Sequence, residues 1–290
     1  MEYVIIVGCP RSGTTYLTRL LDSLRGTECI SGLLLTASEM HVASQDLSEQ
    51  EYNALAVGFR QKIQNYLNGT YHSRLKALQK FFKAPTGEWN RLLRSLRHDR
   101  PMPEYFVYKE PFISFDPGLV ARAIPNAKFI HLVRDGRDCA NSLVNSYDVL
   151  TDDELTGLES AEMLIGRQHD HRYVPWWVED GNEKTFLEAS PYVRSIWMWT
   201  YMVERCDQYF EELEDDGQVL QVKYEQFMRN PRDTGEQILE YLDTGGTQAF
   251  QQQLGQARTS SIGKHTQRPR EEIDAAVDVA QEALAAYGYV

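Results

Sequence analysis

The feature that most constrains the fold is a short apolar run near the start of the chain, followed by a loop and a helical pattern. Residues 4–7 (VIIV) are four adjacent β-branched residues. Because such a run cannot alternate between core and solvent, it predicts a strand that is buried on both faces, as in a parallel sheet. Gly8 and Pro10 end the run. From Thr14 onward, leucines recur at helical spacing, at positions 17, 20, 21 and 24.

The loop between this strand and helix has the composition of an anion-binding turn. The first N–H groups of a helix lack intrahelical partners, and the helix dipole adds positive potential there. Gly13 lets the backbone approach a ligand closely, and Arg11 adds a fork-shaped cation that suits an oxyanion. The expected anion contacts are Arg11, Ser12, Gly13, Thr14 and Thr15.

The same loop differs from a nucleoside triphosphate loop at one informative position. Gly8, Gly13 and Thr15 fit the template G-x-x-x-x-G-K-[ST], but Thr14 stands where that template has lysine. A P-loop kinase or NTPase therefore stays an alternative function, and an anion other than a γ-phosphate is favoured.

The length, cysteine pattern and net charge of the chain limit its domain number, its compartment and its partners. With 290 residues and 42% apolar content, the chain can form one large α/β domain. We expect a cytoplasmic protein, because no signal peptide or membrane-length apolar run is present and the four cysteines form no C-x-x-C pair. The net charge of −12 argues against nucleic-acid binding.

One segment departs from this acidic character. Residues 51–100 hold ten Lys or Arg against three Asp or Glu. This segment is either a solvated helical face or a patch that meets an acidic acceptor, a carrier protein or a membrane surface. The second alternative function is a non-enzymatic nucleotide-binding module that docks to a partner through this basic segment.

Further apolar runs alternate with helical patterns along the chain. Strands are expected at 105–108, 128–133 and 218–222, residues 28–44 are interpreted as a connection, and 148–186 as a long loop or lid. The expected helices are two or three within 50–100, then 117–124, one from near residue 138, 191–213, 234–242 and 271–287. This order predicts a mainly parallel sheet with helices on both faces.

Charged and hydroxyl side chains follow these strands at their carboxyl ends, where parallel sheets bind ligands. Lys109, Arg134 and Tyr224 each come just after a predicted strand, as Arg11 does. Arg134 and Ser142 lie eight residues apart across a strand-to-helix turn and form a second expected phosphate site.

These motifs resemble those of the 3′-phosphoadenylyl-sulfate (PAPS) dependent sulfotransferases, and most closely the tyrosylprotein and bacterial small-molecule or lipid branch. The loop PRSGTT is similar to their 5′-phosphosulfate loop, and LVRDGRDCANS to their 3′-phosphate site. YKEPF, VKYEQF and the turn SSIGK continue the match in the family's order. The resemblance implies a three-layer P-loop-like α/β fold with one domain over 1–290. Helical acceptor-side segments are expected at about 45–103 and 148–190.

The resemblance also implies an activity. It is transfer of a sulfuryl group from PAPS to a hydroxyl group on a small molecule, a lipid or a carrier-bound acceptor, with release of adenosine 3′,5′-bisphosphate (PAP) and no metal. Arg11 and Lys109 are the implied catalytic cations. The implied contacts to the rest of PAP are Arg134, Ser142, Tyr224, Ser260, Ser261 and Lys264.

The base that accepts the acceptor's proton is expected after the first helix, where relatives place a Glu or His. Glu39 is favoured and His41 is the alternative, since either residue can act as a general base if its pKa is tuned. A solvent-facing or helix-capping role for Glu39 is also open, and Leu33 could occupy the position of the relatives' base.

Overall fold

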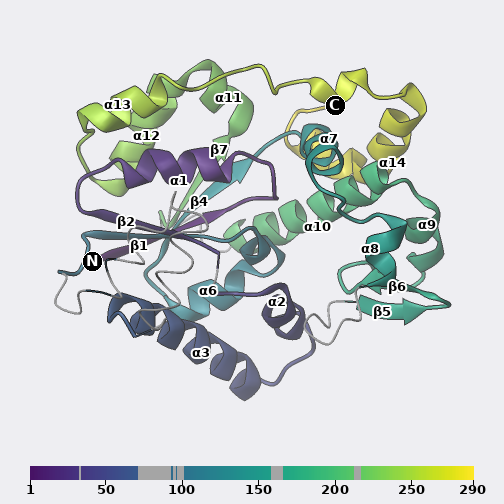
Figure 1. The fold of residues 1–290 in the computed structure, drawn as a ribbon, viewed down its shortest axis with the longest axis horizontal. Helices are drawn as coiled ribbons and strands as arrows, with labels where there is room; N and C mark the ends of the chain where they lie inside the picture. The colour runs from purple at the N-terminus through teal and green to yellow at the C-terminus, as the bar shows by residue number, and fades with distance from the viewer. Residues whose placement is uncertain (33, 71–92, 94–95, 97–100, 158–165, 212–216) are drawn as a thin grey trace.

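A five-stranded parallel sheet lies at the centre of the protein (Figure 1). The order of its strands is β2-β3-β1-β4-β7. The computed structural model describes residues 1–32, 34–70, 93, 96, 101–157, 166–211 and 217–290. The strands of the sheet are β1 (Glu2–Val7), β2 (Thr27–Ser31), β3 (Tyr105–Lys109), β4 (Lys128–Val133) and β7 (Val219–Lys223). A separate antiparallel hairpin joins β5 (Gly166–His169) to β6 (Arg172–Pro175).

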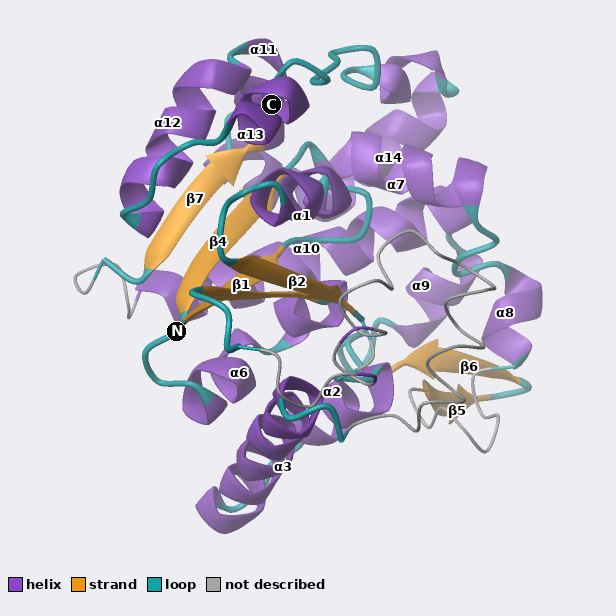
Figure 2. Cartoon of the chain, turned by 60° about the vertical axis from the view of Figure 1, so that its left-hand side comes forward, coloured by secondary structure: helices purple, strands orange, loops and turns teal. Residues whose placement is uncertain are grey.

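Helices cover both faces of the sheet, as the sequence predicts (Figures 1 and 2). The first half of the chain contributes α1 (Thr14–Asp22), α2 (Ala37–Ala43), α3 (Glu49–Leu67), the 3₁₀ helix η1 (Pro111–Phe115), α6 (Pro117–Ala123) and α7 (Gly136–Ser146). The second half contributes α8 (Asp152–Thr156), α9 (Glu183–Glu188), α10 (Pro191–Glu211), α11 (Tyr224–Arg229), α12 (Pro231–Leu242), α13 (Gln248–Leu254), the 3₁₀ helix η3 (Lys264–Gln267) and α14 (Arg270–Ala286).

Strand β1 is buried on both faces, which confirms the interpretation of its β-branched run. Val4 and Ile6 pack into a core with α1, α12 and α13, whereas Ile5 and Val7 pack into a core with α3, α7 and α10. All four side chains are 0% exposed. The sheet is therefore the middle layer of a three-layer α/β fold.

The loops that follow β1 and β4 leave the sheet toward opposite faces. β1 leads into α1 on the face shared with α12 and α13, and β4 leads into α7 on the face shared with α10 and α14. Because β1 and β4 are neighbours in the sheet, this divergence marks the topological switch point of the sheet. The carboxyl ends of the strands at such a point are the usual ligand site of open α/β sheets.

Two segments differ from the sequence prediction. Residues 27–31 form the edge strand β2 rather than part of a connection, and they pair with β3 along their whole length. The segment 148–190, expected as a helical acceptor-side region or lid, contains the β5–β6 hairpin between α8 and α9. The polar pattern of GRQH and RYVP lacks a hydrophobic face, which is why the sequence gives no strand signal there.

Most of the basic segment 51–100 lies outside the described residues. Within its described part, Arg60 Nε donates to the Ala123 carbonyl (2.5 Å), and Lys62 Nζ contacts the Leu34 carbonyl (3.1 Å) and pairs with Glu39. Both of these cations therefore have partners within the chain.

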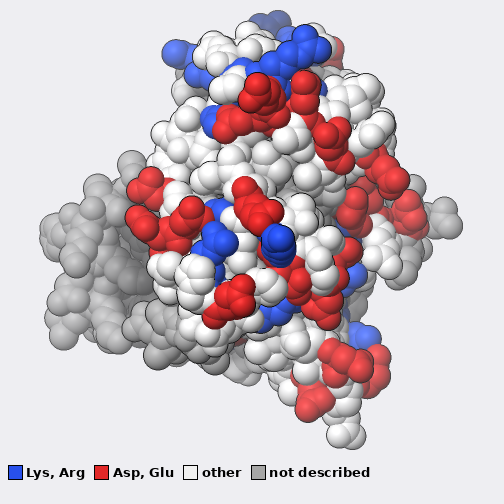
Figure 3. Space-filling model, turned by 90° about the vertical axis from the view of Figure 1, so that its right-hand side faces the viewer, with Lys and Arg blue, Asp and Glu red and all other residues white. Residues whose placement is uncertain are grey.

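Acidic side chains are spread over the middle and lower part of the face that carries α8, α9 and α14, and several Lys and Arg side chains gather at its top (Figure 3). Exposed carboxylates on it include Asp152, Asp180 and Asp274, with side-chain exposures of 70%, 94% and 64%. Among the described residues, no helix combines the length and apolar character needed to cross a bilayer.

Candidate functional site

The loop after β1 is shaped by residues with positive φ. Gly13 has φ +100°, and a Cβ at this position would lie 2.7 Å from the ring of Tyr224. Arg11 adopts φ +72°, a left-handed conformation that is uncommon for a residue with a side chain. The backbone N–H of Gly8 donates to Ser114 Oγ (2.8 Å) and ties the start of the loop to η1. The loop is thus pressed closely against its neighbours.

Donors at the start of α1 remain available to a ligand. Gly13 is the N-cap residue, it makes no side-chain cap, and the first turn of α1 holds no acidic residue. Ser12 Oγ is buried and has no hydrogen-bond partner. Buried polar groups are normally paired, so an unpaired hydroxyl beside free helix N–H groups fits a bound anion.

Arg134 connects three distant segments at the carboxyl end of β4. Its Nη1 donates to the Arg11 carbonyl (2.8 Å), and its Nη2 donates to the Ser261 carbonyl (2.6 Å). The guanidinium lies 4.7 Å from the ring centroid of Tyr224, whose hydroxyl is 2.7 Å from Ser261 Oγ. The side chain of Arg134 is 6% exposed, and its buried Nε has no partner. This orphaned donor is a second observation that fits an anion.

The two predicted anion sites are in direct contact. Arg11 Nε donates to Ser142 Oγ on α7 (2.9 Å), and the Arg11 guanidinium lies 5.4 Å from the ring centroid of Tyr147. The structure therefore brings Arg11, Ser142, Arg134, Tyr224 and Ser261 together. Ser260 and Lys264 lie in the same turn as Ser261 and are exposed.

Asp138 organises this turn, and the sequence analysis missed it. It lies on α7 and is 1% exposed. Its carboxylate accepts hydrogen bonds from the backbone N–H groups of Gly263 (2.6 Å) and His265 (3.0 Å). The carboxylate also contacts His265 Nδ1 (2.9 Å). Its Oδ2 lies 3.7 Å from Arg134 Nη2. Burial alone would raise the pKa of Asp138, but the hydrogen bonds from His265 and Gly263 and the charge of Arg134 outweigh burial and lower it. The i,i+4 spacing of Arg134 and Asp138 is the sequence signal that could have indicated the pair.

Lys109 lies at the carboxyl end of β3 and lines a cavity of about 400 Å³. Burial lowers the pKa of Lys109, and the nearby carboxylate of Glu110 counteracts this effect only in part. Arg11, Thr14 and Thr15 also line this cavity, so it adjoins the anion-binding loop. Its wall is largely aromatic or apolar and includes Phe112, Phe115, Tyr147, Trp176, Trp177 and Met198.

The two expected bases, Glu39 and His41, make other contacts in the structure. Glu39 forms the capping box of α2 with Thr36, and its other carboxylate oxygen pairs with Lys62. His41 stacks on Trp176, with ring centroids 5.5 Å apart and planes at 9°. Neither Glu39 nor His41 is among the described residues that line the cavity. The capping alternative for Glu39 matches its observed contacts.

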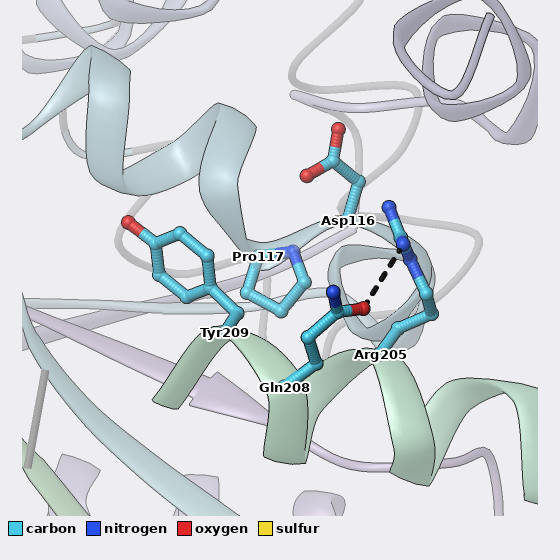
Figure 4. A pocket seen from close by; sticks show the side chains of 5 residues that line it. All are labelled: Asp116, Pro117, Arg205, Gln208 and Tyr209. Carbon is cyan, nitrogen blue, oxygen red and sulfur yellow. Dashed lines mark hydrogen bonds between the residues drawn. The ribbon is translucent and has the colours of Figure 1, made fainter. Parts of the chain in front are cut away.

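A smaller polar pocket of about 140 Å³ lies between α6 and α10, and Figure 4 shows the side chains around it. Arg205 Nη1 donates to Gln208 Oε1 (3.3 Å), and the Asp116 carboxylate accepts a hydrogen bond from the Tyr52 hydroxyl (2.9 Å). None of the predicted site residues lines this pocket among the residues that the structure describes. It is separate from the candidate site.

The parallel sheet, its switch point between β1 and β4 and the two arginine-bearing loops define the class: an α/β protein with a P-loop-like fold. Residues 3–188 match the sulfotransferase family. The chain belongs to that family.

Curated relatives agree with this assignment. Mouse protein-tyrosine sulfotransferase 1 is 30% identical over 146 residues, which cover 50% of this chain and 34% of the mouse protein. Drosophila melanogaster protein-tyrosine sulfotransferase is 22% identical over 245 residues, which cover 84% of this chain and 38% of the fly protein. The chain thus spans little more than a third of the length of these relatives.

Two solved structures share the fold over the whole chain. Sulfotransferase STF9 from Mycobacterium avium has a TM-score of 0.52 at 16% identity, and the match covers 100% of this chain and 77% of that protein. The sulfotransferase domain from the curacin biosynthetic pathway has a TM-score of 0.51 at 16% identity and covers 100% and 98% of the two chains. At these identities the matches establish the fold alone.

Proposed function

We propose that this protein transfers a sulfuryl group from PAPS to a hydroxyl acceptor and releases adenosine 3′,5′-bisphosphate. The observation that carries the proposal is the meeting of two arginine-bearing loops at the switch point between β1 and β4, directly beside an aromatic-walled cavity. The two loops offer two positions for anionic groups, and the cavity offers a position for an acceptor. Membership of the sulfotransferase family supports the same reaction.

The residues present fit the two phosphate-bearing ends of the donor substrate. Ser12, Gly13, Thr14 and Thr15 at the start of α1, together with Arg11, would hold the 5′-phosphosulfate. The orphaned Ser12 Oγ supports this assignment. The donor supplies an activated sulfuryl group attached to a phosphate that leaves readily.

The remaining predicted contacts would hold the adenosine 3′-phosphate. Arg134, with its orphaned Nε, and Ser142 are the central pair. Tyr224 and Ser261 position Arg134 from the other side, through the ring contact and the carbonyl contact. We also assign Ser260 and Lys264 to this end, since they belong to the turn that Asp138 fixes.

Lys109 and Arg11 would stabilise the negative charge that develops on the leaving phosphate. Both side chains line the cavity at its boundary with the anion loop. Fixed cations in a site that excludes water stabilise such charge without reorganising during the reaction. An anion beside Lys109 also offsets the desolvation that lowers the pKa of its ammonium group.

The acceptor would lie against the aromatic wall of the cavity. A volume of about 400 Å³ is within the range of small-molecule sites. This size suits a hydroxyl-bearing small molecule, or the end of a lipid or of a carrier-bound chain. The four cysteines are buried and free, which supports a reducing compartment such as the cytoplasm.

Isothermal titration calorimetry with adenosine 3′,5′-bisphosphate tests the proposal, with magnesium-ATP as the comparison ligand. We expect bisphosphate binding without a requirement for magnesium, followed by transfer of ³⁵S from labelled PAPS to a panel of hydroxyl compounds. Tight binding of magnesium-ATP and none of the bisphosphate would instead support the kinase or NTPase alternative. Bisphosphate binding without transfer to any compound would support a docking module.

A further inference from the structure

One carboxylate is present among the described residues that line the aromatic cavity, and it belongs to Glu154 on α8. Lys109, Arg11 and Thr15 line the same cavity. We propose that Glu154 is the general base that accepts the hydroxyl proton of an apolar acceptor bound in this cavity. This inference rests on the proposed sulfuryl transfer.

The position of Glu154 is fixed by its own loop. The backbone N–H of Leu150, another residue of the cavity wall, donates to the Glu154 carboxylate, and Thr151 Oγ1 accepts from the Glu154 N–H (3.2 Å). Leu150 itself has φ +56°. A non-glycine residue persists in this conformation only where its surroundings determine it strongly.

A buried arginine, Arg194, holds Leu150 in this backbone conformation. Arg194 on α10 is 2% exposed, and it donates to the Leu150 carbonyl (2.9 Å) and to Asp152 Oδ1 (2.8 Å). The guanidinium of Arg194 therefore holds both Leu150, which lies two residues before α8, and Asp152, the first residue of α8. The loop that carries Glu154 is built onto the core, which is what a precisely oriented base requires.

The surroundings of Glu154 raise the pKa of its carboxyl group above that of an ordinary glutamate. Partial burial is the main cause, the hydrogen bond from Leu150 N–H opposes it, and the charge of Asp148 raises the pKa further. A base is most effective when its pKa approaches the working pH. The neighbouring Asp152 on α8 pairs with Arg172 and Arg194, and Arg11 and Lys109 line the same cavity as Glu154.

The proposed step balances in atoms and electrons. The acceptor oxygen forms a bond to sulfur while its proton passes to the Glu154 carboxylate. The bond between sulfur and the bridging oxygen of the donor breaks, and its electron pair leaves with that oxygen on the phosphate. Arg11 and Lys109 supply positive charge for this phosphate.

Aromatic side chains in the wall of the cavity contact one another. Phe115 and Trp176 contact each other with ring centroids 5.0 Å apart, and the His41 ring stacks on Trp176. Such a preassembled aromatic surface binds apolar and aromatic groups. An aromatic hydroxyl compound is therefore the appropriate probe for a base in this cavity.

The test uses the full-length protein with PAPS and 2-naphthol as the aromatic hydroxyl probe. Glu154→Gln should lower kcat by about 100-fold or more, the usual contribution of a positioned base. Its affinity for the bisphosphate, measured by calorimetry, and for 2-naphthol, measured by tryptophan fluorescence, should match wild type. Glu154→Asp, which keeps a carboxylate, should retain more activity than Glu154→Gln.

The matched control is Asp153→Asn, which removes a carboxylate from the same helix that is not among the described residues lining the cavity, and it should leave kcat unchanged. The wild-type kcat/KM should fall as pH is lowered through an apparent pKa above that of an ordinary glutamate, because the base is then protonated. Glu154→Gln should lack this acid limb.

Several results would overturn the inference. A wild-type kcat in a folded Glu154→Gln protein would rule out Glu154 as the general base. A loss of activity in Glu39→Gln or His41→Ala alone would assign the role of general base to Glu39 or His41 instead. Transfer to charged but not to apolar hydroxyl compounds would rule out an apolar acceptor. A wild-type protein that does not bind the bisphosphate refutes the proposed function itself and is thereby distinguishable from these outcomes.

Discussion

Replacement of Arg134 by alanine is the sharpest test of the candidate anion site. The change removes a buried guanidinium that contacts the carbonyls of Arg11 and Ser261, the ring of Tyr224 and the carboxylate of Asp138. Hydrogen bonds to charged groups contribute about 1.5–3 kcal/mol. Since about 1.4 kcal/mol corresponds to tenfold in affinity, the Kd for adenosine 3′,5′-bisphosphate should rise about 10- to 150-fold.

The assay is calorimetry with two nucleotides. Adenosine 5′-monophosphate lacks the 3′-phosphate, so Arg134→Ala should weaken its binding far less than binding of the bisphosphate. Arg137→Ala is the control, because it removes a neighbouring cation that pairs with Asp135 and contacts the Tyr289 carbonyl. We expect it to lower the melting temperature and leave bisphosphate affinity close to wild type.

Two results would refute this reasoning. An unchanged Kd for the bisphosphate would mean that Arg134 does not contact a ligand phosphate. Equal losses for both nucleotides would mean that Arg134 acts only by shaping the loops around Arg11 and Ser261.

Three further predictions follow from the structure. Gly13→Ala should weaken bisphosphate binding and lower the melting temperature, because the new Cβ meets Tyr224 at a φ of +100°; wild-type values for both would contradict the tight loop packing. Lys109→Ala should lower kcat about 100-fold with bisphosphate affinity less affected, and a change in affinity alone would argue against a role in the transition state. Burial lowers the pKa of His131 to about 3, so wild type should lose stability as pH falls below about 6.5, where the unfolded chain binds the proton first. His131→Phe should flatten that dependence of melting temperature on pH, and an unchanged slope would exclude His131 as its source.

The strands that the sequence predicts are those with a strong core signal. The runs in β1 and β4 are apolar on both faces because helices cover both sides of the sheet. The edge strand β2 escaped prediction because its buried residues include Glu28, which accepts a hydrogen bond from the Tyr66 hydroxyl (2.8 Å). A tertiary partner makes this polar residue compatible with a strand interior, and no local pattern reveals that partner.

The site was predicted best where its residues follow strands. Arg11, Lys109 and Arg134 could be placed at one edge because the carboxyl ends of parallel strands meet there. Glu154 gives no such signal, since it reaches the cavity only through the fold of the loop that Arg194 holds.

For Glu39, the sequence itself contains the pattern that favours a helix-capping role over that of a base. Thr36 and Glu39 stand at capping-box spacing just before a helix, which predicts the observed contacts. The apolar start of the chain thus indicated the site more clearly than the polar candidates beyond the first helix did.

The contacts of Arg134 have a consequence for how the protein reaches its native state. They join residues 11, 134 and 261, which span most of the chain. Contacts so distant in sequence form late, because long loops must close before such contacts stabilise the structure. During synthesis, the sheet can therefore assemble on the ribosome while the anion site is still incomplete. Because Ser261 lies C-terminal to all five strands of the sheet, its contact with Arg134 can form only after the whole sheet has been synthesised.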